Sequence, residues 1–116
     1  MKKVACVYFE TDSKRRPVQE FIDSLDRRTQ RKFFSKVELL EEFGHKLPEP
    51  HVKYIGDDIF ELRFVGTEGQ IRILYFFFHL HKAILTNGFI KKSNKTPKKE
   101  KMIAIGRRKY YLEKHT

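Results

Sequence analysis

The sequence is poor in the features that mark secreted, disulfide-bonded and membrane-embedded proteins. It holds a single cysteine, Cys6, so no intramolecular disulfide can form, which agrees with a reducing compartment. The longest apolar run near the middle, residues 73–78, is far shorter than the roughly 20 residues of a membrane-spanning helix. Glu10 ends the apolar N-terminal run before it reaches the length of a signal peptide. We therefore expect a cytoplasmic protein that has no membrane partner.

Motifs that would announce a metal or cofactor site are also missing from the sequence. It contains no glycine-rich phosphate loop, no paired zinc-type cysteines and no Ser/His/Asp arrangement. His79 and His81 flank a predicted turn, but neither has an acidic or cysteine partner at a telling spacing. A position at the tip of the turn is therefore favoured over a metal site, and we expect no metal and no cofactor.

Positive charge is what the sequence has in excess, and most of it lies near the C-terminus. The net charge is +10, and residues 91–116 supply +8 of it, with 10 Lys/Arg against 2 Asp/Glu. A polyanion is the natural partner of such a region, because binding releases the counterions that are condensed on phosphates. A solvated basic tail is the alternative interpretation of the charge taken alone.

Hydrophobic periodicity predicts one domain over residues 1–116, built from five strands and three helices. Pro17 suits the first turn of a helix, Asp26 suits a helix N-cap and Gly44 a helix end. The order β-α-α-β-β-β-β-α predicts an α+β fold, in which a twisted, mainly antiparallel sheet carries the first two helices on one face. The other face is then only partly covered, and it is where we expect the functional site. The predicted elements are a strand at 3–9, a helix beginning at Pro17, a helix from Asp26 to Gly44, strands at 52–55, 59–65, 70–78 and 83–90, and a helix at 98–112.

Two adjacent predicted strands each carry one arginine on the face opposite an unbroken apolar row. Alternation of side chains places Arg63 and Glu61 on one face of the 59–65 strand, and Arg72 likewise on the 70–78 strand. Arginines so placed could bind a phosphodiester through paired hydrogen bonds, whereas surface arginines with Glu61 as salt-bridge partner are the alternative. Crowded positive charge also lowers the pKa of a lysine, which could then act as a general base. The residues expected to gather around the arginines are Lys46, His51, Lys53, Lys91, Lys92 and Lys95.

Three segments of the sequence resemble those of a known family. Residues 88–97, Gly-Phe-Ile-Lys-Lys-Ser-Asn-Lys-Thr-Pro, resemble the Gly-Phe-X-Lys-Lys…Lys-Thr-Pro signature of phage-derived RelE-like proteins, which include the HigB-type toxins. Residues 58–63 and 71–75 look like two further hallmark segments, and all three occur in the family's order. The resemblance implies a RelE-like microbial RNase fold. It also implies a toxin of a type II toxin–antitoxin system, partnered by an antitoxin of helix-turn-helix type.

The resemblance further implies an endoribonuclease that cuts messenger RNA on the ribosome. In the family's chemistry a ribose 2′-OH attacks the adjacent phosphate, and no metal is required. By position, Arg63 and Arg72 would stabilise the phosphate and the transition state, and Lys53 would be the general base. The acid is open, with Tyr110 and Tyr111 in a helix that the pattern cannot orient. The predicted RNA- or ribosome-binding residues are Lys46, His51, Phe89, Lys91, Lys92 and Lys95.

Other interpretations remain open at this point. Phe89 either stacks on a base or, as the alternative, packs in the core. A ParE-like inhibitor of DNA gyrase would share the fold without RNase chemistry, although the arginines and lysines favour the RNase. A non-catalytic RNA- or ribosome-binding module is the third possibility. In each toxin case we expect an acidic antitoxin segment to lie across or beside the basic surface.

Overall fold

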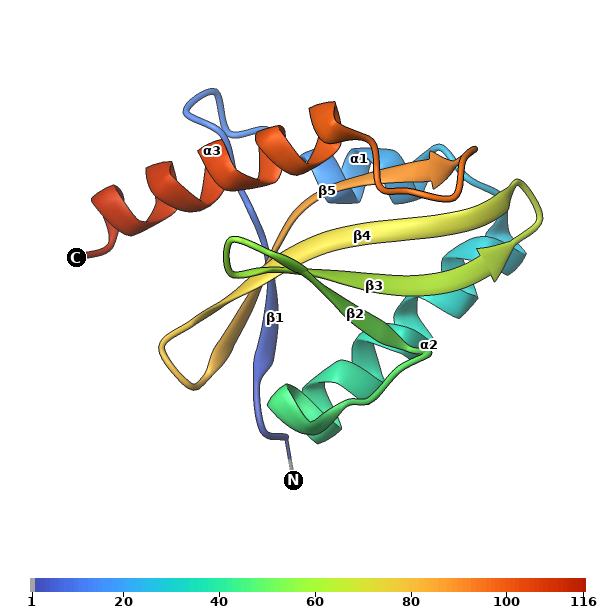
Figure 1. Ribbon diagram of the computed structural model, residues 1–116, viewed down its shortest axis with the longest axis horizontal. Helices are drawn as coiled ribbons and strands as arrows, with labels where there is room; N and C mark the ends of the chain where they lie inside the picture. The colour runs from blue at the N-terminus through green and yellow to red at the C-terminus, as the bar shows by residue number, and fades with distance from the viewer. Residues whose placement is uncertain (1) are drawn as a thin grey trace.

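A computed structural model describes residues 2–116, which form a five-stranded sheet and three α-helices (Figure 1). The predicted α+β fold and its element order are confirmed, with element ends that differ from prediction by about two residues or fewer in most cases. No helix within residues 2–116 is long and apolar enough to cross a lipid bilayer. The elements are β1 (Ala5–Tyr8), α1 (Pro17–Asp23), α2 (Arg27–Phe43), a 3-10 turn (Gly44–Lys46), β2 (Val52–Gly56), β3 (Ile59–Gly66), β4 (Gly69–Phe78), β5 (Lys82–Lys91) and α3 (Lys98–Lys114).

The local signals for the helix ends act as the sequence predicts. Pro17 opens α1 in its first turn, where its missing N–H costs no hydrogen bond. The Asp26 side chain caps α2 by accepting a hydrogen bond from the backbone N–H of Arg28, at 3.1 Å. Gly44 ends α2 at a φ of +55°, a conformation that glycine adopts without strain. These signals fix where α2 begins and ends, and α2 borders the candidate site described below.

The sheet has the order β1-β5-β4-β3-β2. Strands β2 to β5 form the predicted antiparallel meander, whereas β1 adds to β5 in parallel at the other side. The central strand β4 is buried along most of its length, as expected for its apolar run. The β4–β5 pairing shifts by one residue around Thr86, because Leu74 pairs with Asn87 while Tyr75 pairs with Leu85. This irregularity lies beside the Asn-Gly bend that the sequence predicts.

Helices cover both faces of the sheet, but unequally (Figure 1). As predicted, α1 and α2 pack on one face, where Ile22 and Phe33 join a core layer with Leu62, Ile71 and Ile73. Helix α3 crosses the opposite face, and its position could not be predicted from the sequence. Its apolar layer contains Phe9, Ile59, Leu74, Phe76, Phe78, Ile84, Phe89, Ala104 and Tyr111.

Neither outer strand of the sheet presents a long open edge. On β1, the backbone N–H of Cys6 donates to the Glu41 carboxylate at 2.8 Å. The N–H groups of Lys3 and Val4 donate to the Glu41 carbonyl oxygen at 2.6 and 3.2 Å. The C-terminal part of α2 therefore covers the outer edge of β1 at Cys6 and the residues just before the strand. At the other side β2 spans only Val52–Gly56 and ends its regular pairing at a register shift.

Candidate functional site

The register of the sheet makes the two predicted arginines cross-strand neighbours on the same face. Arg63 on β3 is the direct partner of Arg72 on β4, on the face that carries α3. Gln70 of β4 is in turn the partner of Lys91 on β5. Like charges that lie directly opposite each other on neighbouring strands are destabilising. The pair therefore needs a counter-charge in order to persist in the free protein.

A buried carboxylate supplies that counter-charge. Glu61 is fully buried, and its Oε1 lies 3.4 Å from Nε of Arg63 and 3.5 Å from Nε of Arg72. Its other oxygen, Oε2, accepts a hydrogen bond from the hydroxyl of Thr96, in the loop that precedes α3. The salt-bridge role considered for Glu61 is therefore present, and it involves both arginines at once.

The two arginines differ in how much of each side chain is exposed. Arg72 is nearly buried, and its Nη atoms donate to the Gln70 side chain at 2.8 Å and to the Ile71 carbonyl oxygen at 3.0 Å. Burial, followed by the positive charge of Arg63, lowers the pKa of Arg72, which still leaves a guanidinium protonated near neutral pH. The Arg63 side chain is 23% exposed, so it is the arginine that a ligand meets first.

Lys91 completes a cluster of cations beside the pair. The pKa of Lys91 is lowered, and burial is the main cause. The charges of Arg72, Arg63 and Lys53 lower this pKa further, whereas the charge of Glu61 raises it. Lys53, the predicted base, is the cross-strand partner of Glu61 and is exposed. A hollow of about 430 Å³ lies at this end of the sheet, and we call it the lysine hollow. It is lined by Arg63, Gln70, Lys91, Lys92, Ser93 and Asn94.

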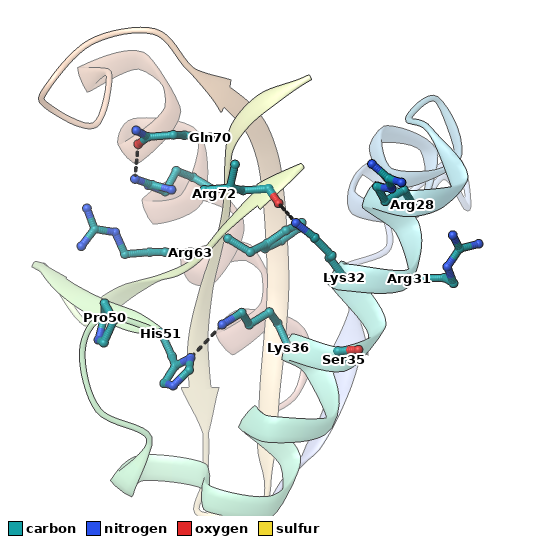
Figure 2. Close-up of a pocket in the computed structure, with 12 residues that line it drawn as sticks. Arg28, Arg31, Lys32, Ser35, Lys36, Pro50, His51, Arg63, Gln70 and Arg72 are labelled. Atoms are coloured by element: carbon teal, nitrogen blue, oxygen red, sulfur yellow. Dashed lines mark hydrogen bonds between the residues drawn. The ribbon is translucent and has the colours of Figure 1, made fainter. Parts of the chain in front are cut away.

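A larger groove of about 850 Å³ runs between α2 and the end of β3, and we call it the basic groove (Figure 2). It exists because β2 pairs with β3 no further than Arg63, whose N–H donates to the His51 carbonyl oxygen at 2.9 Å. The lining contains six Lys/Arg and no Asp/Glu. Its residues are Arg28, Arg31, Lys32, Ser35, Lys36, Pro50, His51, Arg63, Phe64, Val65, Gln70 and Arg72.

Two lysines of α2 reach across the basic groove toward the sheet (Figure 2). Nζ of Lys32 donates to the Val65 carbonyl oxygen at 2.9 Å, on the edge of β3 that β2 leaves free. Nζ of Lys36 lies 2.8 Å from Nδ1 of His51, so the predicted residue His51 forms part of the groove wall. The basic groove and the lysine hollow share Arg63 and Gln70, and together they make one continuous cationic surface.

The sequence model of the phage-derived Gp49-like protein family (DUF891) matches residues 20–109. The chain belongs to the Gp49-like family. This family is associated with RelE-like toxins, so the resemblance is confirmed at that level, while the HigB branch stays a prediction. A search of curated proteins finds no significant match to the chain. The matched range includes α2, both arginines, Glu61, Thr96 and the first part of α3.

The structure separates the predicted site residues of this Gp49-like protein into three groups. Arg63, Arg72, His51 and the lysines at 91 and 92 line the two connected cavities. Lys53 flanks them through its pairing with Glu61. The third group stands apart, because Lys46 is exposed in the 3-10 turn and Lys95 is exposed in the loop before α3, and neither lines the basic groove or the lysine hollow.

For the aromatic residues of the Gp49-like protein, the predicted role of Phe89 is wrong, and the tyrosines that the sequence left open as acids lie elsewhere. Phe89 is only 8% exposed and belongs to the apolar layer beneath α3, so its ring packs in the core and is not available to stack on a base. Tyr111 packs against Phe78, and Tyr110 binds Asp12. Phe78 lies six residues beyond Arg72 along β4, about 20 Å for a strand. The two tyrosines therefore cannot supply an acid at the arginine pair.

The site of the Gp49-like protein also contains residues that sequence reasoning missed. Gln70, Thr96 and the basic side chains of α2 were not predicted to take part. The signal for the α2 residues was present, because positions 28, 31, 32 and 36 follow helical spacing and share one helix face. The Glu61–Thr96 contact joins residues 35 positions apart, and no local pattern announces it.

The chemistry available to this Gp49-like site is that of cations clustered around the basic groove and the lysine hollow. Within residues 2–116, no three His, Cys, Asp or Glu side chains come together in a way that would hold a metal ion. Guanidinium groups bind phosphate oxygens through charge-assisted, paired hydrogen bonds. A lysine of lowered pKa beside them combines anion binding with proton transfer.

Proposed function

We propose that the chain is the toxin of a type II toxin–antitoxin pair, of the RelE/HigB kind, and cuts messenger RNA on the ribosome to inhibit translation. The observation that carries the proposal is the Arg63–Arg72 pair beside Lys91, inside a cation-lined groove. Association of the Gp49-like family with RelE-like toxins supports it. Under this proposal the protein acts in the cytoplasm, because ribosomes translate messenger RNA there.

The proposed reaction needs positive charge where negative charge develops. As the 2′-oxygen attacks, the phosphate gains charge on its non-bridging oxygens, and preorganised donors there lower the barrier. Arg63 presents its partly exposed guanidinium to these oxygens, and Arg72 supplies a second, nearly buried charge. These protein cations supply the electrostatic stabilisation, and we propose that the cleavage step itself uses no metal ion.

Proton transfers complete the proposed step. A neutral lysine takes the proton of the ribose 2′-OH, the 2′-oxygen bonds to phosphorus, and the bond from phosphorus to the 5′-oxygen breaks. The 5′-oxygen takes a proton from an acid, which leaves a 2′,3′-cyclic phosphate and a 5′-hydroxyl. We assign the base to Lys91 in preference to Lys53, because its pKa is lowered by burial and by neighbouring cations.

The acid in this scheme comes from the opposite side of the arginine pair. Lys53 lies on β2 and Lys91 on β5, with β3 and β4 and their two arginines between them. An in-line displacement places the attacking and leaving oxygens on opposite sides of phosphorus. Lys53 is therefore our assignment for the proton donor to the leaving oxygen.

The proposed partners follow from the same surface. The basic groove and the lysine hollow suit the backbone of messenger or ribosomal RNA, since each phosphate contact releases counterions. An antitoxin of helix-turn-helix type would hold the toxin inactive, with an acidic segment across or beside this surface. Charge reversal at Lys91 and Lys92 should then weaken the antitoxin complex.

Primer extension on a messenger RNA in a purified translation system tests the proposed function. We expect discrete, ribosome-dependent cuts with the wild-type protein, and none with Arg63→Ala or Arg72→Ala. Arg15→Ala is the matched control, because Arg15 is exposed and pairs with Glu20 outside both cavities. Growth arrest without any cuts would instead favour a ParE-like gyrase inhibitor or a non-catalytic ribosome-binding protein.

A further inference from the structure

A buried carboxylate is an unexpected component of a surface that is proposed to bind an anion. Glu61 is fully buried, and its Oε1 lies within 3.5 Å of the Nε atoms of the two arginines that would meet the phosphate. A negative charge at this position repels an incoming phosphate, and the repulsion is strong where water is excluded. The Glu61 charge therefore lowers the affinity for the phosphate ligand, which suggests that this carboxylate has another role in the site.

The contacts of Glu61 identify that role. Its Oε1 lies 3.4 and 3.5 Å from the Nε atoms of Arg63 and Arg72, so the contacts are ion pairs between buried atoms that form no hydrogen bond. The Nη ends of Arg72 are held by Gln70 and the Ile71 carbonyl oxygen. One carboxylate thus offsets the repulsion between two cross-strand guanidinium groups and favours the side-chain positions that keep both Nε atoms beside it.

The second oxygen of Glu61 acts on a different part of the molecule. Oε2 accepts the hydroxyl hydrogen bond of Thr96, which belongs to the loop between β5 and α3. This loop also carries Lys92 and Lys95 and begins at Lys91. The Thr96 contact therefore fastens the lysine-bearing loop to the same carboxylate that orients the arginines.

We propose that Glu61 is a positioning residue that orients Arg63 and Arg72 for the transition state and, through Thr96, fastens the 91–97 loop beside them. The inference rests on the proposed function and assigns Glu61 no contact with the substrate. Its charge weakens binding of the RNA ground state, while its geometry accelerates cleavage of the bound RNA. Removal of the charge should therefore move affinity and rate in opposite directions.

Glu61→Gln tests this prediction because it keeps the size of the side chain and removes its charge. Binding is measured by fluorescence anisotropy on a short single-stranded RNA with every ribose 2′-O-methylated, which cannot be cleaved by 2′-oxygen attack. We expect the variant to bind this RNA about three- to tenfold more tightly than the wild type at low salt. In the translation system at saturating toxin, we expect its cleavage rate to fall about tenfold or more.

Thr96 provides a second test that leaves the charge of Glu61 in place. Thr96→Val removes the hydroxyl, and we expect cleavage to fall about tenfold while affinity for the methylated RNA is not increased. Thr96→Ser retains a hydroxyl donor and should restore the wild-type rate. If Glu61→Gln fails to fold, the Thr96 variants test the inference instead. The cleavage rate should fall in Thr96→Val and return to the wild-type value in Thr96→Ser.

Nuclear magnetic resonance of the arginine Nε–Hε groups gives a readout that does not depend on cleavage. In Glu61→Gln we expect the signals of Arg63 and Arg72 to shift and to exchange faster with water, while that of Arg15 stays unchanged. Parallel losses of affinity and rate in Glu61→Gln, or no change in either, would overturn the inference. If the wild type cuts no RNA, the proposed function fails, and binding and the Nε–Hε signals alone judge the role of Glu61.

Discussion

Arg63 and Arg72 are direct cross-strand partners on β3 and β4, and their Nε atoms lie 3.4 and 3.5 Å from one carboxylate oxygen of Glu61. The pair is therefore a prearranged element of the free protein, whose two positive charges are held together before any ligand arrives. Prearrangement of this kind reduces the reorganisation that charge stabilisation would otherwise require. The predictions below test the pair and the surfaces around it.

Two replacements of Arg63 should distinguish the effect of its charge on RNA binding from the effect of its guanidinium geometry on cleavage. We expect Arg63→Gln to weaken binding to single-stranded RNA and to reduce the slope of log affinity against log salt by about 0.7, the value for one phosphate contact. Arg63→Lys should recover much of that slope but little of the cleavage rate, because an ammonium lacks the paired donors of a guanidinium. Anisotropy titrations across a salt series and primer extension provide the two measurements. An Arg63→Lys variant with full cleavage would refute the need for paired donors.

Lys91 should control the dependence of cleavage on pH. A base works in its neutral form, so the rate should rise with pH up to the Lys91 pKa. Because burial and Arg72 lower that pKa, the rise should occur at lower pH than for an ordinary lysine. Lys91→Arg should abolish this rise, because a guanidinium stays protonated across the range. A pH–rate profile that is identical in Lys91→Arg and the wild type would exclude Lys91 as the base.

The α2 side of the basic groove should contribute affinity for RNA rather than chemistry. The double variant Lys32→Ala, Lys36→Ala removes two cations that reach toward the sheet, and we expect the salt slope to fall by about 1.4. Cleavage at saturating toxin should change little. A control double variant, Lys14→Ala with Lys109→Ala, removes the same charge from exposed positions outside the groove. Equal salt slopes in the two double variants would mean that RNA does not follow the groove.

Two glycines should respond in opposite directions to replacement by alanine. A Cβ at Gly88 would lie 2.6 Å from Cδ2 of Phe21 and 2.7 Å from Cδ1 of Ile73, so Gly88→Ala should destabilise the fold by about 1–3 kcal/mol. A Cβ at Gly106 meets nothing within 4 Å, and alanine is the better helix former there. Gly106→Ala should therefore stabilise the protein by up to about 1 kcal/mol. Urea unfolding curves of both variants measure the two changes.

The sequence was a good guide wherever a local rule acts. Side-chain alternation was enough to place Arg63 and Arg72 on one face, and Pro17, Asp26 and Gly44 correctly marked helix ends. These inferences depend on neighbours within a few residues, for which the backbone geometry is nearly fixed. The same explanation holds for the meander, because its strands are joined by short turns.

Features that depend on distant parts of the chain could not be predicted in this way. The orientation of α3 decides that Phe89 is buried and that Tyr110 lies far from the arginines, and a low contrast between its faces left that orientation open. Glu61 was considered as a surface salt-bridge partner, because nothing local shows that Thr96 closes over it. The α2 lysines were missed since helix and sheet meet only in the folded protein.

The coverage of the outer strand β1 by Glu41 has a consequence for the protein at high concentration. An open strand with free N–H and C=O groups is a template on which a second chain can add, and this is a common start of aggregation. The Glu41 carboxylate occupies the outward N–H of Cys6, and the brevity of β2 limits the opposite side of the sheet. Glu41→Ala should therefore raise the tendency of the chain to form fibres, even where its folded stability changes little. A single acidic side chain far from the arginines would in that case keep the protein soluble.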